Sequence, residues 1–160
     1  MSGARDLLRE AALLPDGLKQ KTALLEEAVR LADSENDDKL SYDARMRLLP
    51  AAVFSGDTDK MLIAFAWCVA HYEANPGKYS EFNILWYSKW AALEAPRLPS
   101  VPRARIGQIL DDTERRYRDH GVSLRPVFQQ RHYAAIELGD LDDAARNYEK
   151  WWAEQRDSYA

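Results

Sequence analysis

Apolar residues recur every three or four positions along almost the whole chain, and no stretch alternates between apolar and polar residues as a half-buried strand does. Glycine, proline and short polar runs interrupt this spacing and mark the ends of helices. The pattern predicts eight helices, over about 3–14, 18–33, 39–55, 59–74, 80–95, 103–119, 124–138 and 141–156. We therefore expect an all-α protein.

The predicted helix over 80–95 has the densest apolar pattern of the eight. Its apolar residues form two faces, with Phe82, Leu85, Trp86, Trp90 and Leu93 on one and Ile84, Tyr87 and Ala91 on the other. A helix with two apolar faces is expected to be covered on both sides. We therefore expect Trp86 and Trp90, together with Trp67 on the preceding helix, to lie in the core.

The helices pair into hairpins that resemble one another in sequence. Lys39-Leu40-Ser41 aligns with Lys78-Tyr79-Ser80 at an offset of 39 residues, and Phe54-Ser55-Gly56-Asp57 aligns with Glu137-Leu138-Gly139-Asp140 at an offset of 83 residues. The mean spacing is about 41 residues per hairpin, which is typical of stacked helical repeats. We expect a single domain over 1–160 with hairpins at about 3–33, 39–74, 80–119 and 124–156.

A Gly-Asp turn, followed by a small or medium-sized residue and then by an aromatic residue, occurs in two hairpins. These places read Gly139-Asp140, Ala144 and Tyr148 in the last hairpin, and Gly56-Asp57, Met61 and Phe65 in the second. This arrangement resembles the turn and second helix of a tetratricopeptide repeat. The spacing is longer than that family's period of about 34 residues. A HEAT-like helical array therefore stays open as the alternative fold label.

The resemblance to tetratricopeptide repeats implies a right-handed α-α superhelix, a solenoid in which the first helices of successive hairpins line a concave groove. In that family the groove holds an extended peptide or a partner helix. The resemblance therefore implies a non-catalytic protein–protein interaction scaffold whose partner is another protein or peptide. Aligning the hairpins places seven residues toward the groove, namely Met46, Val53, Leu85, Lys89, Gln129, Tyr133 and Ile136.

The last predicted helix is aromatic, although a terminal repeat normally has a polar outer face. Tyr148, Trp151 and Trp152 form a possible assembly edge with more apolar surface than one preceding hairpin readily covers. In one reading, Trp152 packs back on the helix over 124–138 and Trp151 lies half exposed. In the other, the edge is covered by further repeats of a longer, regulatory protein, by a second copy in a homo-oligomer, or by a partner.

Sequence motifs that carry catalysis are missing. The chain has no Gly-rich phosphate loop, no nucleophile elbow and no His-Glu-x-x-His motif. His71, His120 and His132 lie in separate hairpins, and none has a second histidine or a carboxylate at ligand spacing. We expect no enzymatic activity and no cofactor, and an enzyme with its site in the groove stays as an alternative.

Thiol and metal chemistry are also not expected. The single Cys68 lies in an apolar run, where a buried structural thiol is the ordinary outcome. The acidic run 33–38 suggests a calcium loop, but Asp38 stands where such a loop needs glycine and Ala44 where it needs glutamate. We therefore interpret this run as a solvated loop between repeats and expect no metal site.

Charge is distributed unevenly along a chain with a formal net charge of −4. Residues 97–131 contain four acids and eight arginines, namely Arg97, Arg103, Arg105, Arg115, Arg116, Arg118, Arg125 and Arg131. RNA-binding helical repeats use such basic flanks, so an RNA-binding protein is a further alternative. The interleaved acids argue against a nucleic-acid partner. Asp111 and Asp112 are expected to pair with Arg115 and Arg116 one turn later.

Hydropathy and cysteine content bear on the compartment. The longest apolar stretch, over 61–70, is about half as long as a membrane span requires. The first residues, Met1 to Ala4, are not followed by the apolar core of a secretory signal. One cysteine permits no internal disulfide. We expect a cytoplasmic protein without a membrane partner.

Overall fold

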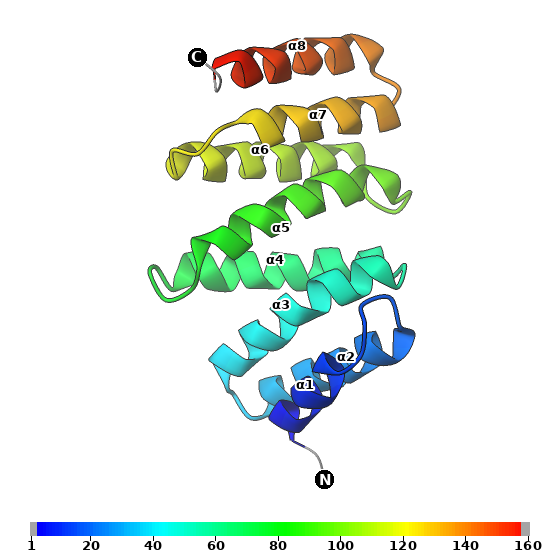
Figure 1. Ribbon diagram of the computed structural model, residues 1–160, viewed down its shortest axis with the longest axis vertical. Coiled ribbons are helices and arrows are strands. Elements are labelled where there is room, and N and C mark those ends of the chain that lie inside the picture. Colours follow the sequence, from blue (N-terminus) through cyan, green and yellow to red (C-terminus); the bar gives the residue numbers. More distant parts are fainter. Residues whose placement is uncertain (1–2, 158–160) are drawn as a thin grey trace. The chain divides into compact units, whose positions relative to one another are not determined.

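The structure, a computed structural model, describes the backbone of residues 3–157 and the side chains up to Glu154 (Figure 1). Within this range the chain forms eight α-helices and one short 3-10 helix, with no β-strand. The helices are α1 (Ala4–Ala12), α2 (Lys19–Ser34), α3 (Asp38–Phe54), α4 (Thr58–Ala74), α5 (Glu81–Glu94), η1 (Ala95–Arg97), α6 (Arg103–Asp119), α7 (Arg125–Glu137) and α8 (Leu141–Asp157). The prediction of an all-α chain with eight helices is confirmed.

The chain divides into two compact units, Met1–Ser80 and Glu81–Ala160. We call them the N-terminal unit, which contains α1 to α4, and the C-terminal unit, which contains α5 to α8 and η1. Each unit is described by itself. A single domain over the whole chain and a right-handed superhelix stay predictions.

In the N-terminal unit each helix packs against the next, so that α2 contacts α1 and α3, and α3 contacts α4. The closely packed side chains include Leu25 of α2, Leu49 of α3 and Met61 of α4, all fully buried. A polar link joins α2 to the end of α3. The buried Thr22 hydroxyl donates to the Ala51 carbonyl at 3.3 Å and lies 3.1 Å from Ser55 Oγ.

The same turn closes α3 in the N-terminal unit and α7 in the C-terminal unit. Gly56 and Gly139 have φ angles of 83° and 76°, which glycine adopts without the steric cost that a Cβ would bring. The next residues, Asp57 and Asp140, donate backbone N–H groups to carbonyls five residues earlier, at 2.8 and 2.9 Å. This is the Schellman pattern that satisfies the last carbonyls of a helix. The positive φ explains the glycine of the repeated Gly-Asp motif, and the same geometry closes α6 at Gly121, where Val122 donates its backbone N–H to the Tyr117 carbonyl at 3.2 Å.

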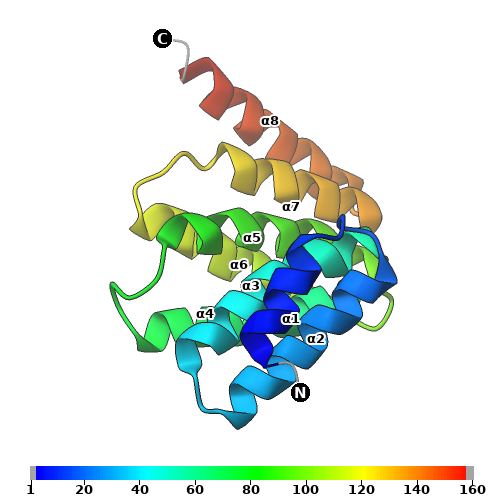
Figure 2. The same cartoon turned by 60° about the horizontal axis from the view of Figure 1, so that its bottom comes forward.

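The C-terminal unit is built around α5, α6 and α7, and α8 lies alongside α7 (Figures 1 and 2). Leu85, Tyr117 and Val127 bring one buried side chain from each of α5, α6 and α7 into a common core. The Tyr117 hydroxyl donates to the Leu85 carbonyl at 3.1 Å, so its burial leaves no polar group unsatisfied. The buried face of α6 consists of Ile106, Leu110, Thr113 and Tyr117, whereas Ile109, which helical spacing also places inward, is half-buried.

The expectation that α5 is buried on two faces is wrong. Phe82 is 66% exposed and Trp86 is 41% exposed, so Trp86 is not the core residue that its spacing predicted. The buried face of α5 instead consists of Ile84, Leu85, Ser88, Ala91 and Ala92. Three of these five have small side chains, which allow neighbouring helices to approach closely. Ile84 and Ala91 belong to the predicted second face and Leu85 to the first, so one covered side combines parts of both. Trp67 and Trp90, also expected in the core, are half-buried.

Two apolar residues of the first hairpin depart from its helical spacing. Ala12 and Leu18 continue the apolar pattern of α1 and α2 but are exposed. Ala28, on the same helix as Leu25, is instead fully buried. Ala12 and Leu18 flank the turn between α1 and α2, where the chain leaves the helix–helix contact, so helical spacing no longer determines which side is covered.

The apolar run over 61–70 lies within α4, where it supplies part of the core. Its buried residues Met61, Phe65, Cys68 and Val69 recur at helical spacing, while Ile63 and Ala66 remain exposed. Among residues 3–157, no helix has both the length and the apolar character that a membrane crossing requires.

Candidate functional site

The seven residues predicted to line a groove are divided between the two units. Met46 and Val53 are half-buried on α3 of the N-terminal unit. The other five lie on α5 and α7, which contact each other within the C-terminal unit; they are Leu85, Lys89, Gln129, Tyr133 and Ile136. Leu85 is buried in the core and presents little surface to a partner, whereas Tyr133 and Ile136 are exposed. A peptide-binding role for all seven stays a prediction.

Five aromatic residues of α7 and α8 form what we call the C-terminal aromatic cluster: His132, Tyr133, Tyr148, Trp151 and Trp152. The ring centroids of Tyr133 and Trp151 are 6.4 Å apart. Tyr148 contacts Trp151 edge-on at 5.9 Å and Trp152 at 6.1 Å. Tyr133 was predicted for the groove and Trp151 for the assembly edge. The structure therefore joins residues of both predicted sets in one surface.

The sequence allowed for Trp152 packing back on α7 and Trp151 lying half exposed. The structure shows the reverse. Trp151 is the half-buried one and makes the ring contact with Tyr133 of α7. Trp152 is 48% exposed and Tyr148 is 41% exposed, and their ring contact lies within α8. Trp151 thus anchors the cluster to α7, and Tyr148 and Trp152 carry its accessible surface.

His132 connects the rings of the cluster to the backbone of α8. Its ring lies 5.5 Å from the rings of both Tyr133 and Tyr148 and 6.2 Å from that of Trp151. Nδ1 lies 2.8 Å from the Ala144 carbonyl oxygen, which only accepts, so Nδ1 carries the proton of this bond. The bond links α7 to α8 at the buried residue Ala144.

A second exposed aromatic surface, which we call the α5 surface, consists of Phe82, Trp86 and Lys89. The rings of Phe82 and Trp86 stack with centroids 6.2 Å apart. Lys89 Nζ lies 3.7 Å from the centroid of the Trp86 ring, which is a cation–π geometry. Burial lowers the pKa of the Lys89 ammonium, because the partly desolvated charge is disfavoured. The surface presents aromatic rings together with one cation.

Acidic neighbours engage many of the arginines in residues 97–131. Arg97 contacts Glu94 and Glu137, and Arg118 contacts Glu114. Arg131 of α7 reaches across to α6 and contacts both Asp111, at 2.8 Å, and Glu114, at 3.1 Å.

The expected pairing of the two adjacent aspartates is therefore only partly right. Asp112 pairs with Arg115 at 3.3 Å, but three rather than four residues away. Asp111 pairs with Arg131 on another helix, a contact that spacing along one helix does not reveal. Acidic side chains thus offset part of the positive charge expected on this flank.

The N-terminal unit contains two clefts beside α1. One, of about 250 Å³, lies between α1 and α3 and is lined by Arg5, Leu8, Arg9, Asp37, Lys39, Leu40, Asp43 and Arg47. The other, of about 260 Å³, is lined by Leu8, Ala11, Ala12, Asp16, Lys21, Leu25, Arg47 and Pro50. In the first cleft Arg5 already contacts Asp37 at 3.7 Å. Asp37 also caps α3 by accepting the Leu40 backbone N–H at 3.0 Å.

Reactive side chains of the N-terminal unit are used in packing. Cys68 is fully buried, and this burial raises the pKa of its thiol to about 12, which keeps it protonated and unreactive. His71 stacks on Trp67 with ring centroids 4.7 Å apart and lies 3.0 Å from the Tyr79 hydroxyl. The burial of Cys68 confirms the structural thiol expected from the sequence, and His71 is packed against aromatic side chains.

The acidic run over 33–38 has structural partners. Asp33 forms a two-bond contact with Arg45 at 2.8 and 2.9 Å, and the Arg45 guanidinium lowers the pKa of the Asp33 carboxyl. Asp37 caps the start of α3. In the described part of the chain, no three histidine, cysteine or acidic residues are grouped as metal ligands would be.

Comparison with known proteins leaves the chain without an assigned family. It matches no protein-family model, no curated protein and no solved structure. The resemblance to tetratricopeptide repeats therefore rests on the quoted residues of this chain, above all the two Gly-Asp turns.

Sequence reasoning missed two residues of the α5 surface and one exposed apolar residue of α8. Phe82 and Trp86 were assigned to the core, and Leu141, which is 71% exposed, was given no role. A signal for Leu141 was present, since a large apolar residue directly follows the Gly139-Asp140 turn and is spaced four, seven and eleven residues before Ala145, Tyr148 and Trp152. That spacing continues the aromatic face of α8 to its first turn.

Proposed function

We propose that this protein is a non-catalytic protein-recognition module whose main contact surface is the C-terminal aromatic cluster. One observation carries the proposal: Tyr133, Tyr148 and Trp152 are exposed in one contiguous group held together by Trp151. Contiguous exposed apolar surface on a folded protein is typical of an interaction site. Tyrosine and tryptophan are also the residues most enriched at interface positions that dominate binding energy.

The rigidity of the cluster supports recognition rather than incidental exposure. The His132–Ala144 hydrogen bond holds α7 against α8, and ring contacts restrain the aromatic side chains in their free state. Pre-ordered side chains lose less conformational entropy when a partner binds. A partner that buries Tyr148 and Trp152 would therefore retain most of the apolar gain as affinity.

We extend the proposal, within the C-terminal unit, to a tetratricopeptide-like surface in which Tyr133 and Ile136 face a peptide together with Lys89 and Gln129. The support is the identical Schellman turn at Gly56 and Gly139, in the second and last predicted hairpins. In this arrangement Lys89 supplies a cation to an acidic or carboxylate group of the peptide. The RNA-binding alternative is less well supported, because Arg97, Arg118 and Arg131 are in contact with acids.

Quantitative affinity capture from an extract of the source cells tests the proposal. The full chain would be compared with the double variant Tyr148→Ser/Trp152→Ser and with the matched control Phe82→Ser, which changes an exposed ring on the α5 surface. We expect the first variant to lose a specific protein that the wild type and the control retain. The affinity of that purified protein should fall at least about tenfold by calorimetry, as expected for loss of central aromatic contacts.

Two further alanine variants examine the groove residues. Tyr133→Ala and Lys89→Ala should weaken binding of the captured protein while the helical circular dichroism stays that of the wild type. Equal affinity of the wild type and the Tyr148→Ser/Trp152→Ser variant for every captured protein would contradict a recognition role for the cluster. Loss of helicity in the Tyr133 or Lys89 variant would instead identify that residue as structural.

A further inference from the structure

The two clefts beside α1 adjoin each other. They share Leu8 and Arg47, so the cleft between α1 and α3, which we call the charged cleft, meets the second cleft at these side chains. Space remains there because α1 packs mainly against α2 and touches α3 at few points (Figure 2). The volumes of about 250 and 260 Å³ together reach the size of pockets that hold small molecules.

The second cleft is lined mainly by apolar side chains, and we call it the apolar cleft. Five of its eight lining residues are Leu8, Ala11, Ala12, Leu25 and Pro50. Two of the others neutralise each other, since Lys21 Nζ lies 2.9 Å from an Asp16 carboxylate oxygen. The remaining one is Arg47, at the junction with the charged cleft. The apolar cleft therefore has room for an apolar group beside one cation.

Most acidic and basic residues near the start of α1 are paired with each other. Arg5 contacts Asp37 at 3.7 Å, and Arg9 contacts Asp6, which does not line the charged cleft, at 3.3 Å. Three residues that line the charged cleft form no ion pair with any residue that the structure describes: Lys39, Asp43 and Arg47. A ligand of this site therefore meets three charges that the surrounding side chains do not neutralise.

Asp43 and Arg47 present opposite charges one turn apart on α3. Residues four apart on a helix have Cβ atoms about 6 Å from each other, so both side chains can reach the two charges of one small zwitterion. Lys39 lies two turns before Arg47, about 12 Å away along the helix axis, and does not line the apolar cleft. The pair next to the apolar cleft is thus one cation and one carboxylate.

We propose that these clefts bind a free α-amino acid with an apolar side chain, such as leucine. The Arg47 guanidinium binds the carboxylate of the ligand, the Asp43 carboxylate binds its ammonium, and its side chain enters the apolar cleft. The inference goes beyond the proposed function, because this site belongs to the N-terminal unit and uses no residue of the C-terminal aromatic cluster.

Related ligands leave part of the site without a counterpart. A fatty acid carries a carboxylate for Arg47 but brings only methylene groups to Asp43, whose charge would lose water without gaining a partner. A residue inside a peptide has neither charge, the first residue of a peptide lacks the carboxylate, and the last lacks the ammonium. A phosphate ester would place negative charge beside Asp43. Only the free amino acid satisfies both side chains and the apolar cleft.

The test compares four ligands, of which three lack one group of the first. These are leucine, leucinamide without the carboxylate, 4-methylpentanoate without the ammonium, and alanine without the larger side chain. The full chain, labelled with ¹³C at its alanine methyl groups, is titrated with each ligand, and the methyl shifts of Ala11 and Ala12 report binding in the apolar cleft. We expect leucine to bind at least about tenfold more tightly than each of the other three.

Three variants assign each ligand group to its side chain. Arg47→Gln should weaken leucine binding at least about tenfold but leave leucinamide binding unchanged, because leucinamide has no carboxylate to lose a partner. Asp43→Asn should weaken leucine binding in the same way and leave 4-methylpentanoate binding unchanged. Ala12→Phe, at an exposed position of the apolar cleft, should fill that cleft and remove the preference for leucine over alanine.

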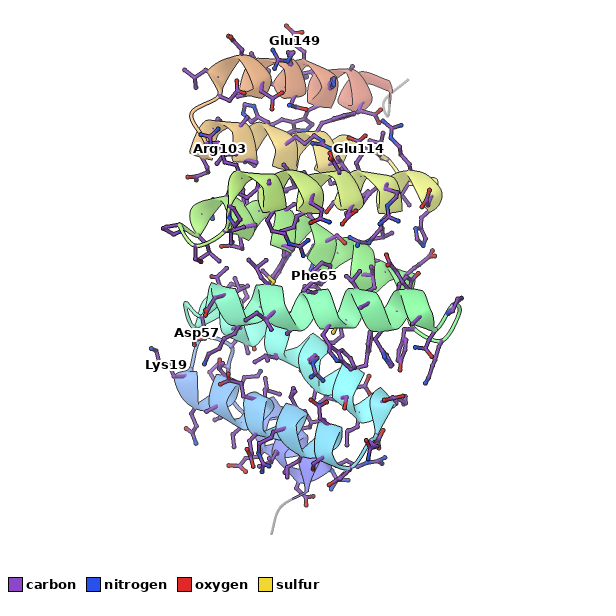
Figure 3. The ribbon with its side chains drawn as sticks, turned by 180° about the vertical axis from the view of Figure 1, so that it is seen from behind. Lys19, Asp57, Phe65, Arg103, Glu114 and Glu149 are labelled. Atoms are coloured by element: carbon purple, nitrogen blue, oxygen red, sulfur yellow. The ribbon has the colours of Figure 1, made fainter. Side chains whose placement is uncertain are left out.

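Two matched controls remove exposed charges that do not line either cleft. Lys19→Gln removes a cation that Figure 3 shows at the start of α2 and that forms no ion pair with a described residue. Asp59→Asn removes an exposed carboxylate of α4. Both variants should bind leucine as the wild type does. The Tyr148→Ser/Trp152→Ser variant should do so too, which separates this site from the proposed function.

The inference is overturned if leucine does not shift the Ala11 and Ala12 methyl signals, or if leucinamide or 4-methylpentanoate binds as tightly as leucine. These results come from the wild type, so they do not depend on any variant folding. Unchanged leucine affinity in Arg47→Gln or Asp43→Asn, with wild-type circular dichroism, overturns it as well. Either control weakening leucine binding does the same. Each of these failures leaves the captured partner of the C-terminal aromatic cluster unaffected.

Discussion

One group of rings in the N-terminal unit and two helices of the C-terminal unit place aromatic residues differently. In the N-terminal unit Tyr42 stacks on Tyr79 at 3.9 Å, and Trp67 contacts both His71 and the Arg45 guanidinium. In the C-terminal unit Phe82 and Trp86 of α5 and Tyr148 and Trp152 of α8 are exposed. The contrast concerns these groups and not every ring, since Phe54 of the N-terminal unit is 61% exposed and Tyr117 of the C-terminal unit is buried.

This difference indicates where recognition is located. The N-terminal unit also exposes large apolar residues, such as Leu13 and Ile63, but Leu13 follows the end of α1 and Ile63 lies on α4. Single exposed apolar residues are normal on folded proteins and need no function. The contiguity of the C-terminal aromatic cluster, rather than the exposure of any one ring, distinguishes it. Substitutions at buried positions should therefore lower the free energy of unfolding more than substitutions at exposed ones.

Leu25→Ala should have the largest effect. Leu25 is fully buried, so the change removes apolar contacts and leaves a cavity, and the free energy of unfolding should fall by about 2–5 kcal/mol. Trp152→Ala should cost less than about 1 kcal/mol, because the ring is about half exposed. Urea unfolding followed by circular dichroism measures both. A loss at Trp152 as large as that at Leu25 would show that Trp152 belongs to the core.

Alkaline pH should destabilise the protein through Cys68. Its folded-state pKa of about 12 lies above the ordinary value of 9.0, so the unfolded chain loses this proton first. The contribution of the buried thiol is complete below pH 9.0 and is lost as pH rises toward 12. The expected slope is about 1.4 kcal/mol per pH unit within that window.

Cys68→Ala removes the thiol and also its interaction with Tyr42, whose pKa is raised chiefly by burial and further by Cys68, so the comparison reports both together. Unfolding free energies measured at several pH values should fall more steeply for the wild type than for Cys68→Ala. Parallel pH dependences would contradict a raised thiol pKa. The native thiol should also react with an aromatic disulfide reagent only after unfolding, which provides a direct check.

Thr22→Val tests the polar link inside the N-terminal unit. The change keeps the side-chain shape but removes the hydroxyl that bonds to Ala51 and lies beside Ser55. The stability should fall by about 1–2 kcal/mol, since a buried carbonyl loses its side-chain donor. Ser34→Ala, which removes an exposed hydroxyl from the end of the same helix, is the control and should change stability by less than about 0.5 kcal/mol.

Arg131→Gln tests the ion pairs between α6 and α7 in the C-terminal unit. Because Arg131 contacts two acids on another helix and is largely buried, the stability should fall by about 1 kcal/mol. Arg115→Gln removes a more exposed contact within α6 and should have a smaller effect. Adding salt should reduce the difference between wild type and Arg131→Gln. Equal effects of the two substitutions would contradict a special role for the inter-helix pair.

Lys89→Met should have the smallest effect on stability, within about 0.5 kcal/mol. The change removes the favourable cation–π contact with Trp86. It also removes the unfavourable free energy of partly burying the Lys89 ammonium, the same desolvation that lowers its pKa. These two contributions oppose each other. A carbon-detected NMR titration should show Lys89 losing its proton below the ordinary lysine pKa of 10.5. Deprotonation at or above that value would contradict the desolvated environment.

Helix positions were predictable because the signals are local. Every predicted boundary lies within two residues of the observed one, and that of α6 coincides with it. The inward face of α6 was equally predictable, since Ile106, Leu110, Thr113 and Tyr117 follow a single stripe in a strongly polar helix. For α5 the same reasoning failed. A helix with apolar residues on two faces carries no local signal for which face its neighbours cover.

The candidate site shows the same division. Tyr133, Tyr148, Trp151 and Trp152 were identified from the sequence, but as members of two separate sets. Their contact depends on how α7 and α8 pack, which is decided by the His132–Ala144 bond and by Trp151 turning toward Tyr133. No pattern along a single helix encodes that contact.

The sequence by itself determined the helices, their Gly-Asp turns and the stripe of apolar residues along α8. These features depend on hydrogen bonds and steric limits within a few residues of chain, such as the positive φ of Gly56 and Gly139. Only the tertiary structure decided that Phe82 and Trp86 stay outside, that Asp111 pairs with Arg131, and that the aromatic residues of α7 and α8 form one surface. Burial and long-range pairing depend on which helix covers which face, and close packing settles that only when the elements meet.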